Sequence, residues 1–583
     1  MAGEGPGTAA RIDAQRRQLS RSSPVDDRSG ARAEPFDVLL ADAALGTPRR
    51  FFPGRAGVQL AASLAMRPGA VARRSRDMAT ELGRVVAGTS EVAPSPRDRR
   101  FADDAWTTNP LLRRLAQAYL VGASTARNLV DDAQLDWSAA ERIDFITENL
   151  IEALAPSNSP LTNPTALKTA VDTAGLSFVR GARNFARDFA EPPRTPSMVD
   201  PSSYRLGENV AASPGAVVMR TEAFELIRYA PATGTVLATP LLVVPPMINK
   251  YYVVDLAPGR SLVEFLVQQG VQVFTVSWRN PQAQHRDWGI DTYAQAIIDA
   301  LDGVQSISGE DRAVLFGACS GGIVSAMTVA HLAATGESDR LAGLTLVVTV
   351  LDMARAGLGS AVVDRRTADA AAAVSAGRGY LDGRTLAEVF AWLRPGDLIW
   401  NYWVNNYLLG KSPPAFDILF WNADVTRMPA RLHRDFLDLA VENSLVQAGR
   451  AELLGSSVDL GLVKTDAYVL AGSADHLCDW ESCYRTSQLL GGQTRFVLST
   501  SGHIAAIVNP PGNPKAGYQI SEASPPSPRQ FLRTAERAEG TWWTDYASWL
   551  RARCGPEIPA PDGLGGGGLQ PITDAPGTYV LEK

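Results

Sequence analysis

A cysteine lies at the centre of a Gly-x-Cys-x-Gly pentapeptide, residues 317–321. The apolar run before it, residues 313–316, has the composition of a buried strand, and the small residues 322–330 are typical of a closely packed helix. A strand that turns sharply into a helix needs glycine beside the central residue, because the backbone is strained there and other segments approach it closely. We therefore expect a strand–turn–helix unit that presents Cys319 at the end of a strand.

This turn has the pattern of the nucleophile elbow of the α/β-hydrolase fold, with sulfur where that fold usually carries a serine oxygen. The pattern alone is also compatible with a structural role, because a buried cysteine in a glycine-rich turn is common. The fold makes a further prediction that separates the two interpretations. An acid should follow a later strand, and a histidine should follow the last one.

Five histidines are available for that last position. His503 fits it, because residues 494–498 are predicted to form a strand and His503 lies in the loop that follows. His285 precedes the cysteine, while His331 and His433 lie in expected helices. The fifth, His476, is the competitor and stands beside a candidate acid.

Asp475 and His476 follow another expected strand, residues 467–471, at the place where this fold carries its acid. We assign Asp475 as the acid and His476 as its loop neighbour. Cys319, Asp475 and His503 then form a candidate catalytic triad in the predicted order. A free thiol has a pKa of about 8.5, so the nucleophile needs His503 to take its proton. Asp475 would hold the imidazole tautomer and compensate its charge.

The oxyanion that develops when a nucleophile attacks a carbonyl group needs backbone donors. One is expected to be the N–H of Ser320, directly after the nucleophile. The other is expected near Met247 or Ile248, in the loop that follows the apolar strand 240–244.

Several motifs resemble those of polyhydroxyalkanoate synthases, and the likeness extends over about residues 95–583. The motifs are residues 245–252, 276–281, 317–322, 397–410 and 501–504. The resemblance implies an acyltransferase that polymerises (R)-3-hydroxyacyl-coenzyme A into polyester and releases coenzyme A through a covalent cysteine thioester. It matches Cys319, Asp475 and His503 to the family's catalytic residues one for one. Either His503 or Asp475 would activate the attacking 3-hydroxyl group.

Three sequence segments resemble those of the class II synthases. They are Ala318 and Ser320 around the cysteine, residues 509–516, and residues 577–580. This resemblance implies a preference for medium-chain-length monomers. A short-chain preference is the alternative. A cysteine-triad thioesterase or esterase of the same fold is a second alternative, with water as the acyl acceptor, and a noncatalytic granule-coat protein is a third.

The resemblance also implies a cytoplasmic homodimer at the surface of polyester granules, with the growing polyester chain as a partner and no cofactor. The sequence has a net charge of −6 and intersperses acidic residues among its arginine pairs, which argues against a nucleic-acid partner. No apolar run reaches the length of a transmembrane span. Cys478 and Cys483 follow His476, but no second cluster completes four ligands, so we expect no metal and interpret both thiols as packed or inert.

About a hundred residues separate the expected strand at 344–350 from the next one near residue 467, far more than an ordinary connection. We expect an inserted cap at about residues 352–460. Its aromatic residues are interpreted mostly as the cap's own core. The alternative is that some line an acyl tunnel above Cys319, and the candidate substrate-binding residues are Trp400, Tyr402, Asn405 and Tyr407.

The chain is expected to divide into three parts. Residues 1–35 are poor in large apolar groups and predict a flexible segment. Residues 36–200 have a helical pattern and end in a proline-rich stretch, and residues 201–583 form the catalytic domain with its cap. Residues 563–568 are expected to be a glycine-rich spacer before a short tail.

Overall fold

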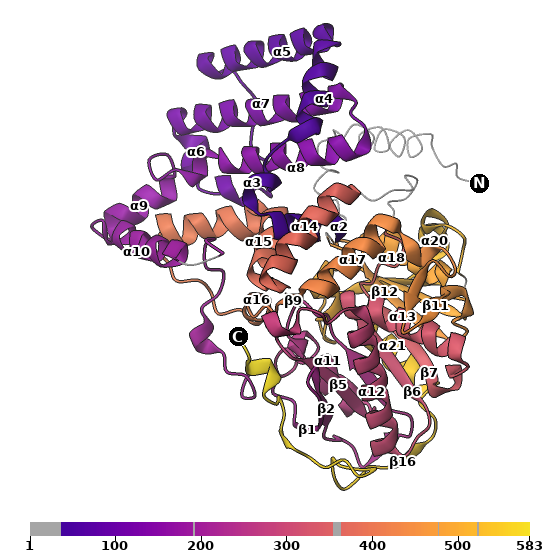
Figure 1. Ribbon diagram of the computed structural model, residues 1–583. Coiled ribbons are helices and arrows are strands. Elements are labelled where there is room, and N and C mark those ends of the chain that lie inside the picture. The colour runs from indigo at the N-terminus through magenta and orange to yellow at the C-terminus, as the bar shows by residue number, and fades with distance from the viewer. Residues whose placement is uncertain (1–35, 191–192, 354–362, 476, 522–523) are drawn as a thin grey trace, which may run out of the picture.

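The computed structural model describes residues 36–583 except residues 191–192, 354–362, 476 and 522–523. The expected flexible segment 1–35 and His476 therefore lie outside the described residues. A large twisted sheet forms the lower part of the molecule in Figure 1, the cap covers one edge of it, and the N-terminal helices stack above the cap. This architecture confirms the predicted α/β-hydrolase fold with an inserted cap and a helical N-terminal region.

The central sheet has the strand order β15-β14-β13-β12-β7-β6-β4-β5-β2-β1-β17. Its middle is parallel and consists of β5 (Val273–Trp278), β4 (Leu241–Val244), β6 (Ala313–Ala318), β7 (Leu341–Val347), β12 (Ala467–Gly472) and β13 (Thr494–Ser499). The antiparallel edges are β1 (Gly215–Arg220), β2 (Phe224–Tyr229), β14 (Gly517–Ser521), β15 (Glu536–Glu539) and β17 (Thr573–Asp574). β7 ends before the expected residue 350, because Val348 has a φ of +44° and turns the chain out of the sheet.

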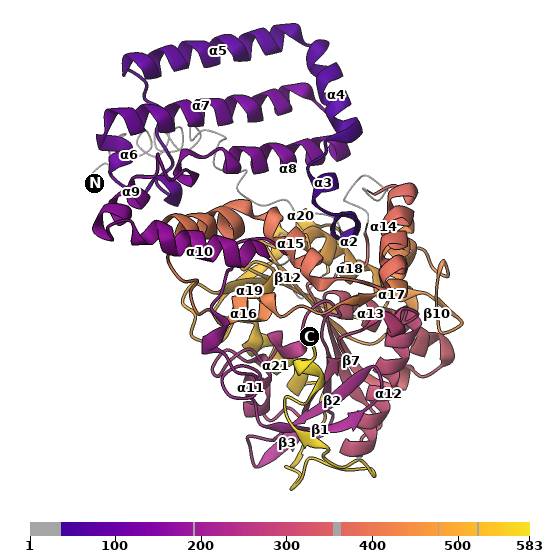
Figure 2. The same ribbon diagram turned by 60° about the vertical axis from the view of Figure 1, so that its left-hand side comes forward.

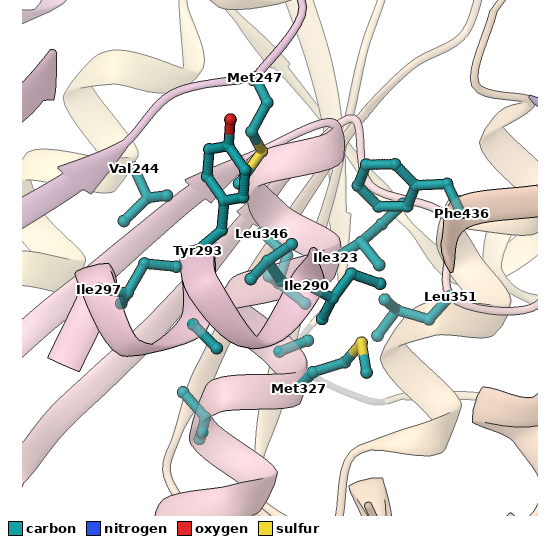
Figure 3. Close-up of a cluster of buried hydrophobic side chains, with 14 of the residues drawn as sticks. Val244, Met247, Ile290, Tyr293, Ile297, Ile323, Met327, Leu346, Leu351 and Phe436 are labelled. Atoms are coloured by element: carbon teal, nitrogen blue, oxygen red, sulfur yellow. The ribbon is translucent and has the colours of Figure 1, made fainter. Parts of the chain in front are cut away.

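Side chains alternate between the two faces of the sheet, so helices can pack on both. On β6, Ala313 and Leu315 join the hydrophobic cluster beneath α12 (Ile290–Ser308) and α13 (Ser320–Thr335), which Figure 3 shows in part. Val314 and Phe316 join the opposite cluster with α11 (Leu262–Gln268) and α21 (Trp542–Arg551). β6 is therefore buried on both sides, which fixes the position of its carboxyl end.

The N-terminal helices form a layered stack that both views show above the sheet (Figure 1, Figure 2). The helices are α4 (Gly54–Ala65), α5 (Pro68–Ala87), α6 (Ala105–Thr108), α7 (Pro110–Ala133), α8 (Trp137–Ala153), α9 (Pro164–Asp172) and α10 (Leu176–Ala190). α7 begins at Pro110 because Asn109 caps it, accepting hydrogen bonds from the N–H groups of Leu111 and Leu112. Within the described residues, no helix of the chain combines the length and hydropathy needed to cross a membrane.

The cap follows β7 and is mainly helical. It contains α14 (Arg365–Arg378), α15 (Gly383–Leu393), α16 (Asp417–Ala423), α17 (Ala430–Glu442) and two π-helical turns, Gly396–Trp400 and Trp403–Leu408. The first described helix, α2 (Phe36–Leu45), packs against α14, α15 and α17. A ring nitrogen of buried His433 in α17 lies 3.2 Å from the carbonyl oxygen of Leu40. α2 therefore belongs with the cap by its packing, although it precedes the N-terminal stack in the chain.

The remaining elements are short. They are α3 (Thr47–Arg50), α18 (Trp480–Leu489), α19 (His503–Ile507), α20 (Pro528–Thr534), β3 (Thr235–Leu237), β8 (Tyr380–Leu381), β9 (Met428–Pro429), β10 (Ala451–Leu453), β11 (Ser456–Val458) and β16 (Glu557–Pro559).

The C-terminal segment, predicted to be a glycine-rich spacer and a short tail, packs on the edge of the central sheet and on α12. After the glycines, β17 pairs with β1 along the sheet edge. The buried ammonium of Lys250 donates to the carbonyl oxygens of Tyr579 and Glu582, at 3.2 and 2.7 Å. Gly567 has a φ of +55°, and a Cβ there would collide with Ser306 at the end of α12. The glycines serve close packing here, which composition alone does not distinguish from a loose linker.

Replacing Gly567 with alanine is expected to destabilise this docked segment. The left-handed backbone costs an L-residue about 1–2 kcal/mol, and the collision with Ser306 adds about 1–3 kcal/mol. Gly568→Ala is the matched control, since its φ is +85° but no atom lies within 4 Å of the added Cβ. Urea unfolding should show a larger loss of unfolding free energy for Gly567→Ala, whereas equal losses would contradict the packing role.

Candidate active site

Cys319 forms the turn between β6 and α13, as expected from the pentapeptide. Its φ of 50° and ψ of −121° are unusual for a residue with a side chain, and such strain persists only where the surroundings enforce it. The Cys319 N–H donates to the Val347 carbonyl at 2.9 Å, and the Cys319 carbonyl accepts from the Ile323 N–H at 3.1 Å. A Cβ on Gly321 would collide with the Pro245 carbonyl oxygen, so this position needs glycine. The turn holds the half-buried thiol at the carboxyl end of the sheet.

Asp475 lies in the loop after β12 and is buried. Its Oδ2 is 2.7 Å from Nδ1 of His503. Its Oδ1 accepts the backbone N–H groups of Leu477 and Cys478, at 2.8 and 2.9 Å. Both carboxylate oxygens are therefore occupied, and the loop is fixed around them.

His503 is the first residue of α19, directly after the loop that follows β13. The indole N–H groups of Trp542 and Trp543 hold this short helix by donating to the carbonyls of Ala506 and Ile507, at 2.6 and 3.1 Å. Since Nδ1 faces Asp475, Nε2 is left for the sulfur. The Cys319 Sγ and a ring nitrogen of His503 belong to a group of ligand atoms that lie within 4.8 Å of one another. The structure thus brings together all three residues of the predicted triad.

The electrostatics of the site favour a thiolate–imidazolium pair. A hydrogen bond from the Cys478 thiol lowers the pKa of Cys319 most; burial opposes this, and His503 adds to the lowering, which brings the pKa to about 5. Burial alone would lower the pKa of His503, but the charge and hydrogen bond of Asp475, together with the Cys319 sulfur, raise it to about 10. These shifts favour the thiolate form of Cys319, which is the nucleophilic form of a cysteine.

Cys478 is the residue of this site that sequence reasoning missed. Its sulfur lies within 4.8 Å of both the Cys319 Sγ and the His503 ring nitrogen, so this thiol packs directly against the candidate triad. The hydrogen bond to Cys319, followed by burial, raises the pKa of Cys478 well above its usual range. The spacing Asp475-x-x-Cys478 carried the signal, since an aspartate that accepts the N–H three residues later folds the chain back on itself. Cys483 is fully buried, consistent with a packed thiol.

The expected oxyanion residues come from two neighbouring segments, since Ser320 follows Cys319 while Met247 and Ile248 lie in the loop after β4. The Ser320 N–H favours the charged sulfur and lowers the pKa of Cys319. The Met247 N–H donates to the Ser320 hydroxyl oxygen at 3.1 Å, so it would have to change partner to reach an oxyanion. The Ile248 carbonyl accepts from the Thr426 N–H at 3.2 Å, which ties this loop to the cap.

Of the four predicted substrate-binding residues, Asn405 and Tyr407 lie in the π-helical turn Trp403–Leu408, which packs against α10. The Tyr407 hydroxyl donates to Asp188 at 3.0 Å, and its ring packs edge-on against Phe185. Asn405 donates to the Asn401 carbonyl, and the Trp400 ring packs against Trp403. Among the hydrogen bonds and ring contacts of the described residues, none joins Trp400, Tyr402, Asn405 or Tyr407 to the triad. Their role in substrate binding stays a prediction.

A different part of the cap shares a hydrophobic cluster with Cys319. The cluster contains Phe420 and Trp421 of α16, together with the sulfurs of Cys319 and Cys478. The Trp421 indole donates to the Lys250 carbonyl at 2.7 Å, and the Tyr252 hydroxyl donates to Asp424 at 3.0 Å. These bonds fix α16 against the loop that follows β4.

Comparison with known proteins agrees with this geometry. The family described as "Poly-beta-hydroxybutyrate polymerase (PhaC) N-terminus" matches residues 97–266, and the alpha/beta hydrolase fold family matches residues 248–510. The chain is 46% identical over 503 residues to poly(3-hydroxyalkanoate) polymerase 2 of Ectopseudomonas oleovorans, which covers 86% of this chain and 90% of that one. It is 38% identical over 518 residues to a poly(3-hydroxyalkanoate) polymerase subunit of Cupriavidus necator, covering 88% and 87%.

Solved structures similar to this chain include an esterase from Exiguobacterium antarcticum. The two are 15% identical, with a TM-score of 0.31, and the match covers 50% of this chain and 92% of the esterase.

Proposed function

The chain belongs to the poly(3-hydroxyalkanoate) polymerase family, a family of acyltransferases, and we propose that it builds polyester through a thioester on Cys319. The substrate would be (R)-3-hydroxyacyl-coenzyme A. The observation that carries the proposal is the 2.7 Å bond between Asp475 and His503 beside the Cys319 sulfur. Such a group supplies a nucleophile, a base and a residue that orients the base.

In the acylation step, the Cys319 thiolate attacks the thioester carbonyl carbon of the substrate. The tetrahedral oxyanion would accept the Ser320 N–H and one amide of the loop at Met247 and Ile248. When the carbon–sulfur bond to coenzyme A breaks, the His503 imidazolium gives its proton to the leaving sulfur. One thioester replaces another, so this step is close to thermoneutral and leaves the loaded enzyme reactive.

In the elongation step, a 3-hydroxyl oxygen attacks the Cys319 thioester and forms an oxoester, while the sulfur leaves. His503 would take the hydroxyl proton as general base. The hydrogen bonds of Asp475 support this assignment over Asp475 itself. Its Oδ2 is bonded to His503 and its Oδ1 to two backbone N–H groups, so three of its four lone pairs are already used, whereas Nε2 of His503 is left for the substrate.

The competing function is thioester hydrolysis, which would need the same three residues and open access for water. The apolar cluster against which Cys319 packs supports polymerisation, because the acyl-enzyme has to survive until a hydroxyl group arrives. Incubation of pure protein with 3-hydroxyacyl-coenzyme A distinguishes the two. Insoluble polyester supports the proposal, and free hydroxy acid as the sole product would refute it.

A preference for medium-chain-length monomers is part of the proposal, supported by the class II resemblance around Cys319 and in residues 509–516. Each methylene is worth about 1–3 kcal/mol of discrimination in an apolar channel. Across 3-hydroxyacyl-coenzyme A substrates of four to twelve carbons, we expect kcat/KM for eight carbons or more to exceed that for four by at least about 10-fold. Rates and polymer composition check this together, and faster incorporation of the four-carbon monomer would reverse the preference.

The setting of the enzyme is likewise proposed. It would act as a homodimer in the cytoplasm, at the surface of the granule that its product forms. The division of the chain into an N-terminal helical domain to about residue 200 and a catalytic domain with a cap at about residues 352–460 is supported by the layered arrangement in Figure 2.

A further inference from the structure

Three metal-ligating atoms meet at the nucleophile. Within the described residues, the Sγ atoms of Cys319 and Cys478 and a ring nitrogen of His503 form the one group of histidine, cysteine or carboxylate ligands that lie within 4.8 Å of one another. The mechanism above uses Cys319 and His503. It gives Cys478 no chemical step, although this thiol completes a set of two sulfurs and one nitrogen.

The arrangement has the features of a zinc-type site. Two thiolates and one imidazole with an open fourth position are an established ligand set for Zn²⁺. A metal-bound histidine usually donates its other ring N–H to a carboxylate, which fixes the tautomer. Here Nδ1 of His503 is held by Asp475 at 2.7 Å, which leaves Nε2 for the ion.

We propose that Cys319, Cys478 and His503 form an inhibitory site for a thiophilic divalent cation such as Zn²⁺. In a tetrahedral site with Zn–S and Zn–N bonds of about 2.3 and 2.0 Å, neighbouring ligand atoms stand about 3.5–3.8 Å apart. Atoms at most 4.8 Å apart therefore close by about 1.3 Å or less. Rotation of the cysteine side chains about χ1 can supply that movement while Asp475 keeps the backbone of the loop in place.

Binding of the cation releases two protons from the site. Cys319 is already a thiolate and binds the ion without losing a proton. Cys478 releases its thiol proton and His503 its imidazolium proton, since each ligand must be deprotonated to bind. The ion then occupies both the nucleophilic sulfur and the base nitrogen, so acylation stops until the metal dissociates.

The test uses Co²⁺ as a spectroscopic probe and Zn²⁺ as an inhibitor, on purified full-length protein kept reduced and free of chelators. Wild-type protein is expected to bind one Co²⁺ with a sulfur-to-metal charge-transfer band. Zn²⁺ should inhibit coenzyme A release reversibly, with activity restored by a chelator. The Co²⁺ band does not depend on turnover, so it reports on this site even if the proposed polymerase activity fails.

Cys478→Val is the diagnostic variant, because it removes one ligand and keeps a side chain of similar size. We expect it to weaken Co²⁺ binding by at least about 100-fold, the scale of a lost ligand contact, and to weaken Zn²⁺ inhibition likewise when normalised to the variant's own rate. Cys554→Ala is the matched control, since that buried thiol lies outside the three-ligand group and should leave the band unchanged. Equal Co²⁺ affinity in wild type and Cys478→Val, or a band lost only in Cys554→Ala, would overturn the proposal.

Discussion

Replacement of Cys319 with alanine is expected to lower the rate of coenzyme A release by at least about 10⁴-fold, the scale seen when a nucleophile is deleted from a triad. Without the sulfur, no covalent intermediate can form, and His503 has no thiolate partner. The alanine keeps the volume of the turn nearly unchanged, so α13 should still begin at Ser320. The measurement is coenzyme A release with 3-hydroxyacyl-coenzyme A, at matched protein concentration.

Cys554→Ala serves as the control for this variant. Cys554 is a buried thiol after α21, and it accepts a backbone hydrogen bond from Thr239 at 2.8 Å through its carbonyl, which alanine retains. We expect its turnover to stay within about twofold of wild type, because it is not part of the thiol–imidazole group. Turnover of Cys319→Ala close to that of wild type would remove Cys319 from its role.

Asp475→Asn is expected to reduce kcat/KM by about 10³-fold or more, the effect of presenting the wrong imidazole tautomer in a triad. The amide oxygen can still accept from Leu477 and Cys478, so the loop should keep its shape. The amide nitrogen, however, would face Nδ1 of His503 as a donor and drive the ring proton to Nε2. That proton would point at the sulfur and prevent Nε2 from accepting another.

The same variant should shift the ionisation of the Cys319 thiol to higher pH. Asp475 raises the pKa of His503 to about 10, so removing its charge lowers that pKa and weakens the imidazolium beside the sulfur. The thiolate then loses a stabilising charge, and the pKa of Cys319 moves up from about 5. Iodoacetamide alkylation of Cys319, followed by peptide mass spectrometry, should have a higher pH midpoint than in wild type. An unchanged midpoint would show that Asp475 does not act through His503.

Much of the fold and the triad could be predicted from the sequence because the signals are local. The pentapeptide around Cys319 specifies a turn, and the apolar runs before Asp475 and His503 specify strands. In a parallel sheet the carboxyl ends of such strands lie at one edge, so their order along the chain implies proximity in space. The same reasoning could not place Cys478, because its approach to Cys319 depends on how the Asp475 loop closes.

The cap shows where local patterns are insufficient. Aromatic content marked the Trp400–Tyr407 stretch, but composition does not reveal which side of a helix meets a partner. The structure packs Tyr407 on α10, whereas Trp421 shares a cluster with Cys319. The packing of the C-terminal glycines could not be predicted for a related reason. Gly567 is required because Ser306, which is distant in sequence, approaches it closely.

The central claim is that Cys319 carries the acyl chain, and a saturated acyl-coenzyme A tests it most directly. This analogue lacks the 3-hydroxyl group, so the chain cannot grow and the first thioester should accumulate. Intact-protein mass spectrometry is predicted to find one acyl group per chain, mapped to Cys319 and removed by hydroxylamine. Release of coenzyme A with the acyl group on another residue, or with no acyl-enzyme at any time, would contradict the account.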